Sequence, residues 1–249
     1  GATIPFGCVS ASAKCLFGDS FAFVGGARGE PIGVYIAGNG TATKVSSMEV
    51  DQLLAAEANP QAIIVENRSS RDERRLFVHL QNQTLVFLLD ASTAAASEIW
   101  YIANSNGPYR PRYSVECYGK QIVGDYASSK LGAISYTSDN HFGQQIEWSF
   151  FAGLIYNESR GAIIHSLELV GLPGRQPFGD SSAIFMSMSR DGMTFSNEVA
   201  LPIKGFGARD QRMQWRPHVR ITNYAGLKFR GRGINGFARL EAEIEPLTV

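Results

Sequence analysis

The sequence contains little cysteine, histidine or charge, and each shortage excludes a class of protein. Only three cysteines and four histidines occur among 249 residues, and no two cysteines stand at the C-x-x-C spacing of a zinc site. We therefore expect no metal site, and the lack of a P-loop or a G-x-G-x-x-G motif leads us to expect no cofactor. No apolar run reaches the length of a membrane span. The opening residues, GATIPFGCVS, lack the charged and apolar regions of a signal peptide, so we expect none.

What the chain has instead is glycine. The 26 glycines and a charged fraction of only 18% indicate that residues are used for turns rather than for charged helix surfaces, which predicts an all-β fold. The thiols of Cys8, Cys15 and Cys117 are expected to be structural and reduced. The net charge is zero, but residues 209–249 hold eight Lys/Arg and four Asp/Glu, which gives that segment a charge of +4.

The clearest pattern lies between Gln211 and Glu245. Residues 212–221 alternate polar and apolar side chains, which predicts a strand with one solvated and one buried face. We place Trp215 in the structural core on the buried face, and Phe195, just upstream, in the core as well. The alternation recurs in residues 227–232 and 238–245, so three antiparallel strands are predicted here.

Two of these three strands have a basic solvated face and the third has an acidic one. The acidic strand could lie beside the second basic strand, because opposite charges on facing strands are mildly stabilising. We favour pairing within the chain or across a subunit interface over contact with DNA or simple exposure. The interface candidates are Arg212, Arg216, Arg220, Arg230, Arg232, Glu241, Glu243 and Glu245.

The first part of the chain reads as three groups of about four short strands, each group about the size of a β-propeller blade. One helix is predicted over Met48–Ala58, capped by Ser47 and ended by Asn59-Pro60. Longer strands begin near Phe150. The sequence thus predicts propeller blades in residues 1–149, forming only part of a ring, and a β-sandwich-like module in residues 150–249.

Two shorter motifs are interpreted as structural features and not as binding sites. The charged run SSRDERR, within a loop predicted from Asn67 to Arg75, is interpreted as solvated. The segment Ser189–Phe195, SRDGMTF, resembles an Asp-box hairpin whose loop is one residue short. We interpret it as a tight Asp-Gly turn rather than as a calcium or sugar site.

The order of elements resembles that of the packaged-DNA stabilisation proteins of short-tailed phages, also called tail accessory or tail hub proteins. The resemblance rests on GCVSASAKCLFGDSFAFVGG, on GVYIAGNGTATKVSSMEVDQLL, on LFVHLQNQTLVFLLDAS with IWYI, and on MSMSRDGMTFSNE followed by MQWRPHVRITNYAGLKFRG. It runs along nearly the whole chain and corresponds to the C-terminal half of the family. The shortened Asp box and the missing N-terminal blades depart from the family pattern.

The resemblance implies a structural protein and not an enzyme. Its partners would be further copies in a homohexameric ring, the portal adaptor or head-completion protein, tail needle, spike or fibre proteins, and non-specifically held DNA in the lumen. The ring would sit below the portal and retain packaged DNA. The protein would belong to the virion tail and be assembled in the host cytoplasm.

The alternative is a carbohydrate-binding or glycoside-processing propeller. It needs a carboxylate pair, or an arginine cluster with a tyrosine nucleophile, and nothing in the spacing of the candidates selects them. His141, His165 and His218 have no serine or cysteine nucleophile motif nearby. The candidates are Asp125, Asp139, Glu147, Tyr126 and Arg112.

Overall fold

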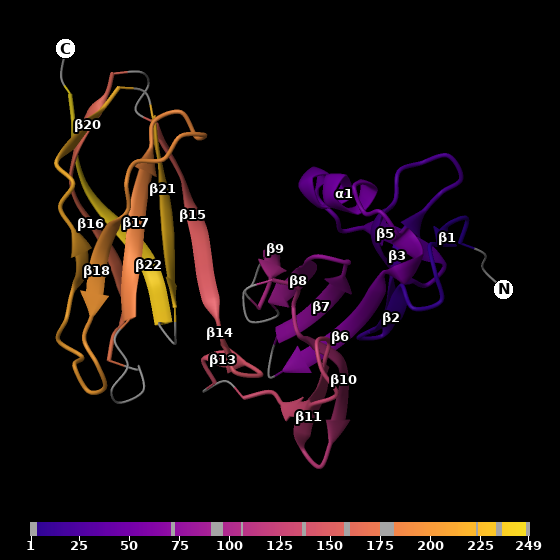
Figure 1. The fold of residues 1–249 in the computed structure, drawn as a ribbon. Helices are drawn as coiled ribbons and strands as arrows, with labels where there is room; N and C mark the ends of the chain where they lie inside the picture. Colours follow the sequence, from indigo (N-terminus) through magenta and orange to yellow (C-terminus); the bar gives the residue numbers. More distant parts are fainter. Residues whose placement is uncertain are drawn as a thin grey trace. The chain divides into compact units, whose positions relative to one another are not determined.

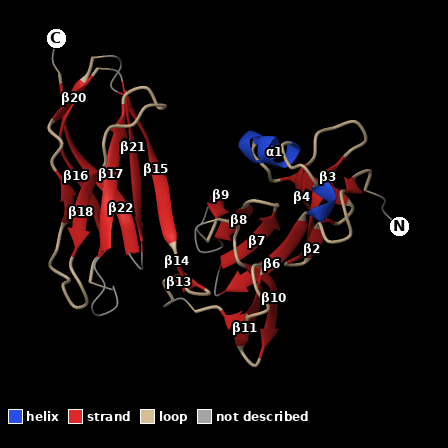
Figure 2. Ribbon diagram, viewed as in Figure 1, coloured by secondary structure: helices blue, strands red, loops and turns tan. Residues whose placement is uncertain are grey.

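The computed structural model describes residues 4–70, 73–90, 97–105, 107–135, 138–156, 160–174, 182–222, 224–232 and 236–247. They form two compact units, Gly1–Ile134 and Ser135–Val249 (Figure 1). Strands make up nearly all of the regular structure (Figure 2), which confirms the predicted all-β class. We expected the division after residue 149, whereas the units divide after Ile134.

The first sheet of unit 1 is a meander of short strands. Its strands are β1 (Gly7–Cys8), β2 (Lys14–Phe17), β3 (Ser20–Gly26), β4 (Gly33–Gly38) and β5 (Thr41–Lys44). Both β1 and β2 pair with β3, while β4 and β5 follow in order on its other side. Because β1 and β2 both lie beside β3, the sheet is four strands wide, as expected of a propeller blade.

Helix α1 (Met48–Ala55) follows the first sheet. The hydroxyl oxygen of Ser47 accepts a hydrogen bond from the backbone N–H of Val50 at 3.4 Å, as an N-cap should. Its apolar side is buried through Val50 and Leu54. The helix ends at Ala55, three residues before the predicted end, and Pro60 starts the short 3₁₀ turn η1 (Pro60–Ala62).

The second sheet contains β6 (Ile64–Ser70), β7 (Glu73–His79), β8 (Thr84–Asp90) and β9 (Ser97–Ala103) in sequence order. The prediction of a loop from Asn67 to Arg75 was wrong. Strands β6 and β7 stay paired up to Ser70 and Glu73, because Arg68 is buried and held by partners. Residues 71–72, between these two strands in the sequence, lie outside the described residues.

The first and second sheets pack together through an apolar core. Side chains from β3 and β4 meet side chains from β6, β7 and β8, and α1 adds two more. The buried members of this core are Ala13, Phe17, Ala22, Val24, Val34, Val50, Leu54, Ile63, Val65, Leu76, Val78, Leu80, Leu85 and Phe87.

The third sheet has three strands, β10 (Pro111–Cys117), β11 (Lys120–Asp125) and β12 (Leu131–Ala133). The expected fourth strand at Ile146–Phe151 does not join it. That segment lies in β15 (Glu147–Tyr156), which pairs with β21 (Tyr224–Arg232) of unit 2 instead. A two-stranded hairpin in unit 2, β13 (Asn140–His141) with β14 (Gln144–Gln145), comes between them in sequence.

Unit 2 is built from two four-stranded antiparallel sheets. One has the order β15-β21-β17-β18; in the other, β19, β20 and β22 all pair with β16. The apolar core contains β16 and β21 residues such as Ile164, Leu167 and Phe229. The remaining strands are β16 (Ala162–Leu172), β17 (Ser182–Ser189), β18 (Val199–Ile203), β19 (Met213–Trp215), β20 (Val219–Ile221), β21 (Tyr224–Arg232) and β22 (Gly236–Pro246).

The predicted strand over residues 212–221 is interrupted. It forms β19 and β20 with an irregular segment between them, in which His218 has a φ of 44°. Both pieces pair with β16, and the alternation survives the break: Trp215 is 4% exposed and Ile221 1%. Phe195, by contrast, is only half-buried and lies outside the cluster of buried residues. Its hairpin turns the ring toward Phe151, at a centroid distance of 6.0 Å.

Candidate functional site

The basic strand β21 faces its charges outward, and its two arginines pair with carboxylates of unit 2. In register, Arg232 lies opposite Glu147 and Arg230 opposite Ser149. Nε of Arg232 donates to Oε1 of Glu147 at 2.6 Å. Arg230 binds Glu198 with two hydrogen bonds, of 2.6 and 2.5 Å, and the Arg230 guanidinium lowers the pKa of the Glu198 carboxyl. This bidentate geometry is the stronger form of the ion pair.

The acidic strand β22 does not lie beside β21, so the predicted cross-strand ladder was wrong. Strand β22 pairs with β16 in the other sheet, with Glu241 opposite Glu168. The physical reason is the core: with β22 placed on β16, Leu240 packs against the same apolar cluster as Leu169, its partner in the register.

The glutamates of β22 find other partners on the outer face of that sheet. Glu241 lies 2.5 Å from Arg239. Glu243 accepts a hydrogen bond from the Ser166 hydroxyl at 3.1 Å, and Glu245 lies 2.9 Å from Nε2 of His165.

Of the arginines on this outer face, Arg212 is paired with Glu168, with Nε donating to Oε1 at 3.0 Å. That hydrogen bond lowers the pKa of the Glu168 carboxyl. Within the described part of the chain, Arg216 and Arg220 have no carboxylate partner, and both are exposed. Arg220 faces Ile163 in the register, and Ile163 faces Glu245 on its other side.

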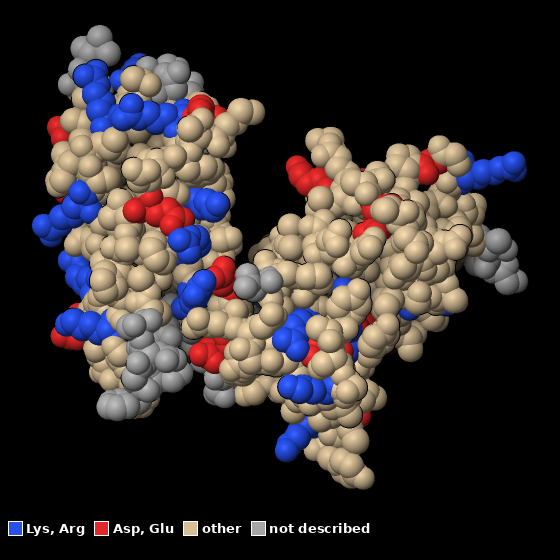
Figure 3. Space-filling view, in the orientation of Figure 1, with Lys and Arg blue, Asp and Glu red and all other residues tan. Residues whose placement is uncertain are grey.

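The outer faces of unit 2 therefore carry both signs of charge in close alternation. On the sheet with β16, the guanidinium groups equal the carboxylates in number: Arg212, Arg216, Arg220 and Arg239 against Glu168, Glu241, Glu243 and Glu245. Figure 3 shows blue and red patches side by side over this unit. Exposed pairs of this kind each contribute little to stability. A mixed surface of this kind suits a complementary protein surface better than a polyanion such as DNA.

The Asp-box-like hairpin uses its polar groups on itself. Oδ1 of Asp191 accepts hydrogen bonds from the backbone N–H groups of Met193 at 2.8 Å and Thr194 at 2.7 Å. The Thr194 hydroxyl donates to Oδ2 at 2.8 Å, and these bonds lower the pKa of Asp191. These hydrogen bonds of the Asp191 carboxylate all lie within the turn, which is the arrangement that a purely structural turn requires.

Three of the candidate catalytic residues, Arg112, Asp125 and Tyr126, lie close together at the pairing of β10 with β11. Asp125, Tyr126 and Arg112 lie in unit 1, while Asp139 and Glu147 lie in unit 2. Asp125 forms an ion pair with Arg110, which lowers the pKa of Asp125.

Most of the remaining candidates also contact other side chains. Arg112 stacks over the ring of Tyr126 at 3.9 Å, and Asp139 accepts a hydrogen bond from Asn140 at 3.0 Å. His165 and His218 contact each other edge to face at 5.9 Å, and His141 is half-buried. No cluster of metal-ligating side chains occurs among the described residues.

Sequence reasoning missed a buried polar cluster in unit 1 that joins the second sheet to the third. Glu66 of β6 accepts hydrogen bonds from the backbone N–H groups of Tyr113, at 2.5 Å, and Ser114, at 3.1 Å. Arg68 donates to the Tyr109 hydroxyl at 3.1 Å and to the Pro111 carbonyl at 2.8 Å. Hydrogen bonds of charged side chains thus hold the second sheet to the third, whereas apolar side chains hold the first sheet to the second.

The same cluster holds a fully buried histidine, His79. Its Nδ1 lies 2.9 Å from the Thr84 hydroxyl, and its Nε2 lies 3.0 Å from Oε1 of Glu66, although the ring is not aligned for a hydrogen bond there. Burial lowers the pKa of His79. Burial also acts to raise the pKa of Glu66, but His79, Arg68 and the Tyr113 N–H outweigh it and lower that pKa to about 2.

The cluster has the residue types of an active site, but it has no open access. His79 is 0% and Arg68 3% exposed, and the Arg68 guanidinium lies 4.1 Å over the ring of Phe77. Structural ion-pair networks perturb pKa values as active sites do. The buried cluster around Glu66 and Arg68 is therefore a structural contact between the second and third sheets. One signal for it was present: Glu66 and Arg68 stand two residues apart and so share a strand face.

The three thiols are not joined by disulfide bonds. All three cysteines are free, and Cys8 and Cys117 are exposed rather than buried. Burial raises the pKa of the Cys15 thiol to about 12, with a smaller contribution from Glu66. In the part of the chain that the structure describes, no helix is long and apolar enough to cross a membrane.

Comparison with known proteins gives two matching family models. The model "Bacteriophage P22 Gp10, beta-propeller" matches residues 1–139, and "Bacteriophage P22 Gp10, beta-sandwich" matches residues 147–245. The "Tail hub protein gp10" of Salmonella phage P22 is 25% identical over 224 residues, which cover 87% of this chain and 46% of the relative. The chain thus spans about half the length of the curated relative that it matches.

One solved structure is also similar, at a low level. It is an exo-beta-1,3-galactanase from Phanerochaete chrysosporium, 10% identical, with 90% of this chain and 65% of that chain covered and a TM-score of 0.23. A similarity of this size carries no argument about fold or activity.

Proposed function

Because the chain belongs to the bacteriophage P22 Gp10 family, which joins a β-propeller to a β-sandwich, we propose that it is a structural component of a phage tail hub. The observation that carries the proposal is the order of the two family models, which cover 1–139 and 147–245 and follow the two units of the structure. The candidate catalytic residues do not favour a second function, because Asp125 and Glu147 are held in ion pairs with Arg110 and Arg232 and the Arg112 guanidinium lies over the ring of Tyr126.

We propose further that the complete protein assembles into a homohexameric ring below the portal. There it would contact the portal adaptor above and needle, spike or fibre proteins below, and would keep packaged DNA from leaking through the lumen. The balanced charge on the outer faces of unit 2 supports protein contacts at these surfaces. DNA in the lumen would be held non-specifically.

The experiment is a complementation test with a phage that lacks this protein. Heads should fill with DNA and then lose it, and supplying the protein during infection should restore retention. The amount of nuclease-protected DNA in purified particles is the measurement. Particles that retain DNA and infect normally without the protein would contradict the proposal.

A further inference from the structure

The first sheet of unit 1 is apolar on the face turned away from the second sheet. The strand register places side chains of this face in two rows that cross β2, β3, β4 and β5. One row is Leu16, Phe21, Ala37 and Ala42, and the other is Lys14, Phe23, Tyr35 and Lys44.

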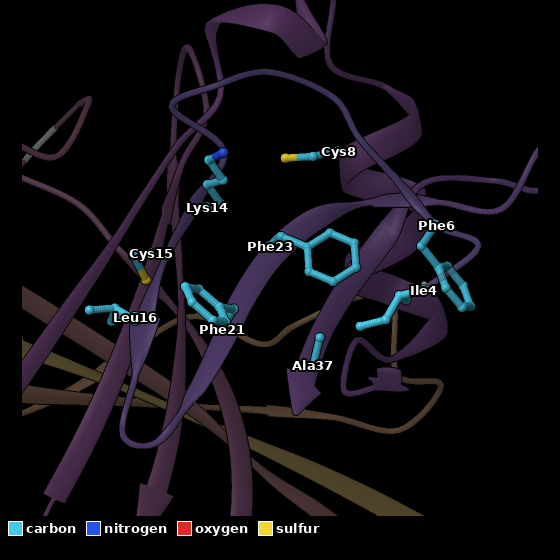
Figure 4. Close-up of a pocket in the computed structure, with 9 residues that line it drawn as sticks. All are labelled: Ile4, Phe6, Cys8, Lys14, Cys15, Leu16, Phe21, Phe23 and Ala37. Atoms are coloured by element: carbon cyan, nitrogen blue, oxygen red, sulfur yellow. The ribbon is translucent and has the colours of Figure 1, made fainter. Parts of the chain in front are cut away.

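This outer face forms an open groove of about 510 Å³. The segment before β1 crosses its edge and places the ring of Phe6 4.8 Å from that of Tyr35. Leu16 and Phe21 remain 62% and 57% exposed. In Figure 4, the rings of Phe21 and Phe23 lie on neighbouring parts of the groove, with Cys8 and Lys14 near one end.

The opposite face of the same sheet is also apolar, and it is covered by another sheet. There Ala22, Val24 and Val34 are completely buried by the second sheet. An antiparallel sheet with one solvated face alternates apolar and polar residues, whereas β3 and β4 present apolar residues to both sides. A sheet of this composition is an interior layer, and an exposed aromatic patch marks a contact surface.

We propose that this groove is the contact face for a further blade of the same propeller, one that lies outside residues 1–249. Propellers close with four to eight blades, and the described residues of unit 1 contain three sheets. The chain spans 46% of its curated relative, so a polypeptide of the relative's length has room for more blades. The proposal depends on the propeller fold and not on the role in the tail.

The side chains that line the groove indicate the chemistry of the blade that would occupy it. Its contacting face is a sheet with bulky apolar side chains at alternate positions, like the face of the second sheet that covers Val24 and Val34. Lys14 stands at the rim and, among the described residues, has no carboxylate partner. We therefore expect a carboxylate or a carbonyl group at the matching edge of the occupant.

The test is photo-crosslinking in the complete native protein with p-benzoylphenylalanine at position 21. We expect cross-links within one polypeptide, from position 21 to a peptide outside residues 1–249. The matched control carries the same residue at Tyr118, which is 99% exposed after β10 of unit 1 and does not line the groove, so it should not give that cross-link. Cross-links from position 21 to a second copy of residues 1–249, to a different protein, or to nothing would overturn the proposal.

A second measurement needs no substitution. Cys8 lines the groove and is exposed in the chain described here, so a covering blade should shield its thiol. In the complete native protein we expect iodoacetamide to modify Cys8 roughly tenfold more slowly, or slower still, than in urea, because alkylation requires access to the thiolate. Equal rates would show that the groove is open and would overturn the proposal.

Discussion

The indole ring of Trp215 lies in the core of unit 2 and is held on two sides. Its ring centroid is 5.5 Å from that of Phe229, and its N–H donates to the carbonyl of Val199 at 3.2 Å. The ring thus ties β19 of one sheet to β21 and β18 of the other. A single side chain that bridges two sheets should be costly to remove.

We predict that Trp215→Ala lowers the free energy of unfolding by roughly 3–5 kcal/mol, the usual cost of truncating a buried aromatic residue. Chemical denaturation would measure this loss. Phe206→Ala, a change at an exposed aromatic residue, is the control and should have little effect. A loss below about 1 kcal/mol for Trp215→Ala would mean that the site is not a packed core.

Glu66 gives unit 1 a specific dependence on pH. Its pKa is about 2 in the folded chain, against 4.5 for the free side chain. A lowered pKa means that the unfolded chain binds the proton first, so the stabilisation is complete above pH 4.5 and is lost as the pH falls toward 2. Glu66→Gln should flatten the stability profile between these pH values.

Glu66→Gln should also destabilise the protein at neutral pH by roughly 3–5 kcal/mol, since it leaves Arg68 buried without its charge partner. Denaturation at a series of pH values would measure both effects. Glu116→Gln, a change at an exposed glutamate of β10, serves as the control. A Glu66→Gln variant that loses stability between pH 4.5 and 2 as steeply as the native chain would refute the assignment.

At the scale of elements, the hairpin between β17 and β18 is closed by Asp191, whose carboxylate accepts the N–H groups of Met193 and Thr194. Asp191→Ala removes both acceptors. We predict that the amide hydrogens of these two residues then exchange faster, while those of β16 are unchanged, as hydrogen-exchange mass spectrometry would show. Arg190→Ala, at an exposed residue of the same turn, is the control. Unchanged exchange at Thr194 would contradict this account of the turn.

Local signals in the sequence were sufficient for most elements. Period-two alternation predicted which residues of β19 and β20 are buried, because a strand has only two faces. The cap at Ser47 and the Pro60 break located helix α1 to within three residues at its end. Both signals depend on neighbours in the chain, which a sequence displays directly.

Pairing between distant strands was not predictable in the same way. Strand β22 could satisfy its charges beside either β21 or β16, and only the shape of the apolar core decides between them. The buried cluster around Glu66 was missed for a related reason. The run from Asn67 to Arg75 has the composition of a loop, and its strand structure depends on partners in β10, more than forty residues away.

At the scale of the whole molecule, we predict that the outer charges of unit 2 serve assembly. Reversing Glu241, Glu243 and Glu245 to Lys would place three cations beside Arg239 and His165. The balanced face would become strongly basic, so the ring should fail to form. A matched control reverses Glu30, Glu57 and Glu116 of unit 1. A triple variant of β22 that assembles normally and gains salt-sensitive DNA affinity would replace the assembly proposal with DNA binding.

The most direct test of the account is the native mass of the complete protein, taken from its source and measured at near-physiological salt. A tail hub component should be found as a closed ring, and we predict a homohexamer. Electron microscopy of the same sample should show a central channel. A protein that stays monomeric at every concentration tested, alone and with extracts of tail proteins, would contradict the account.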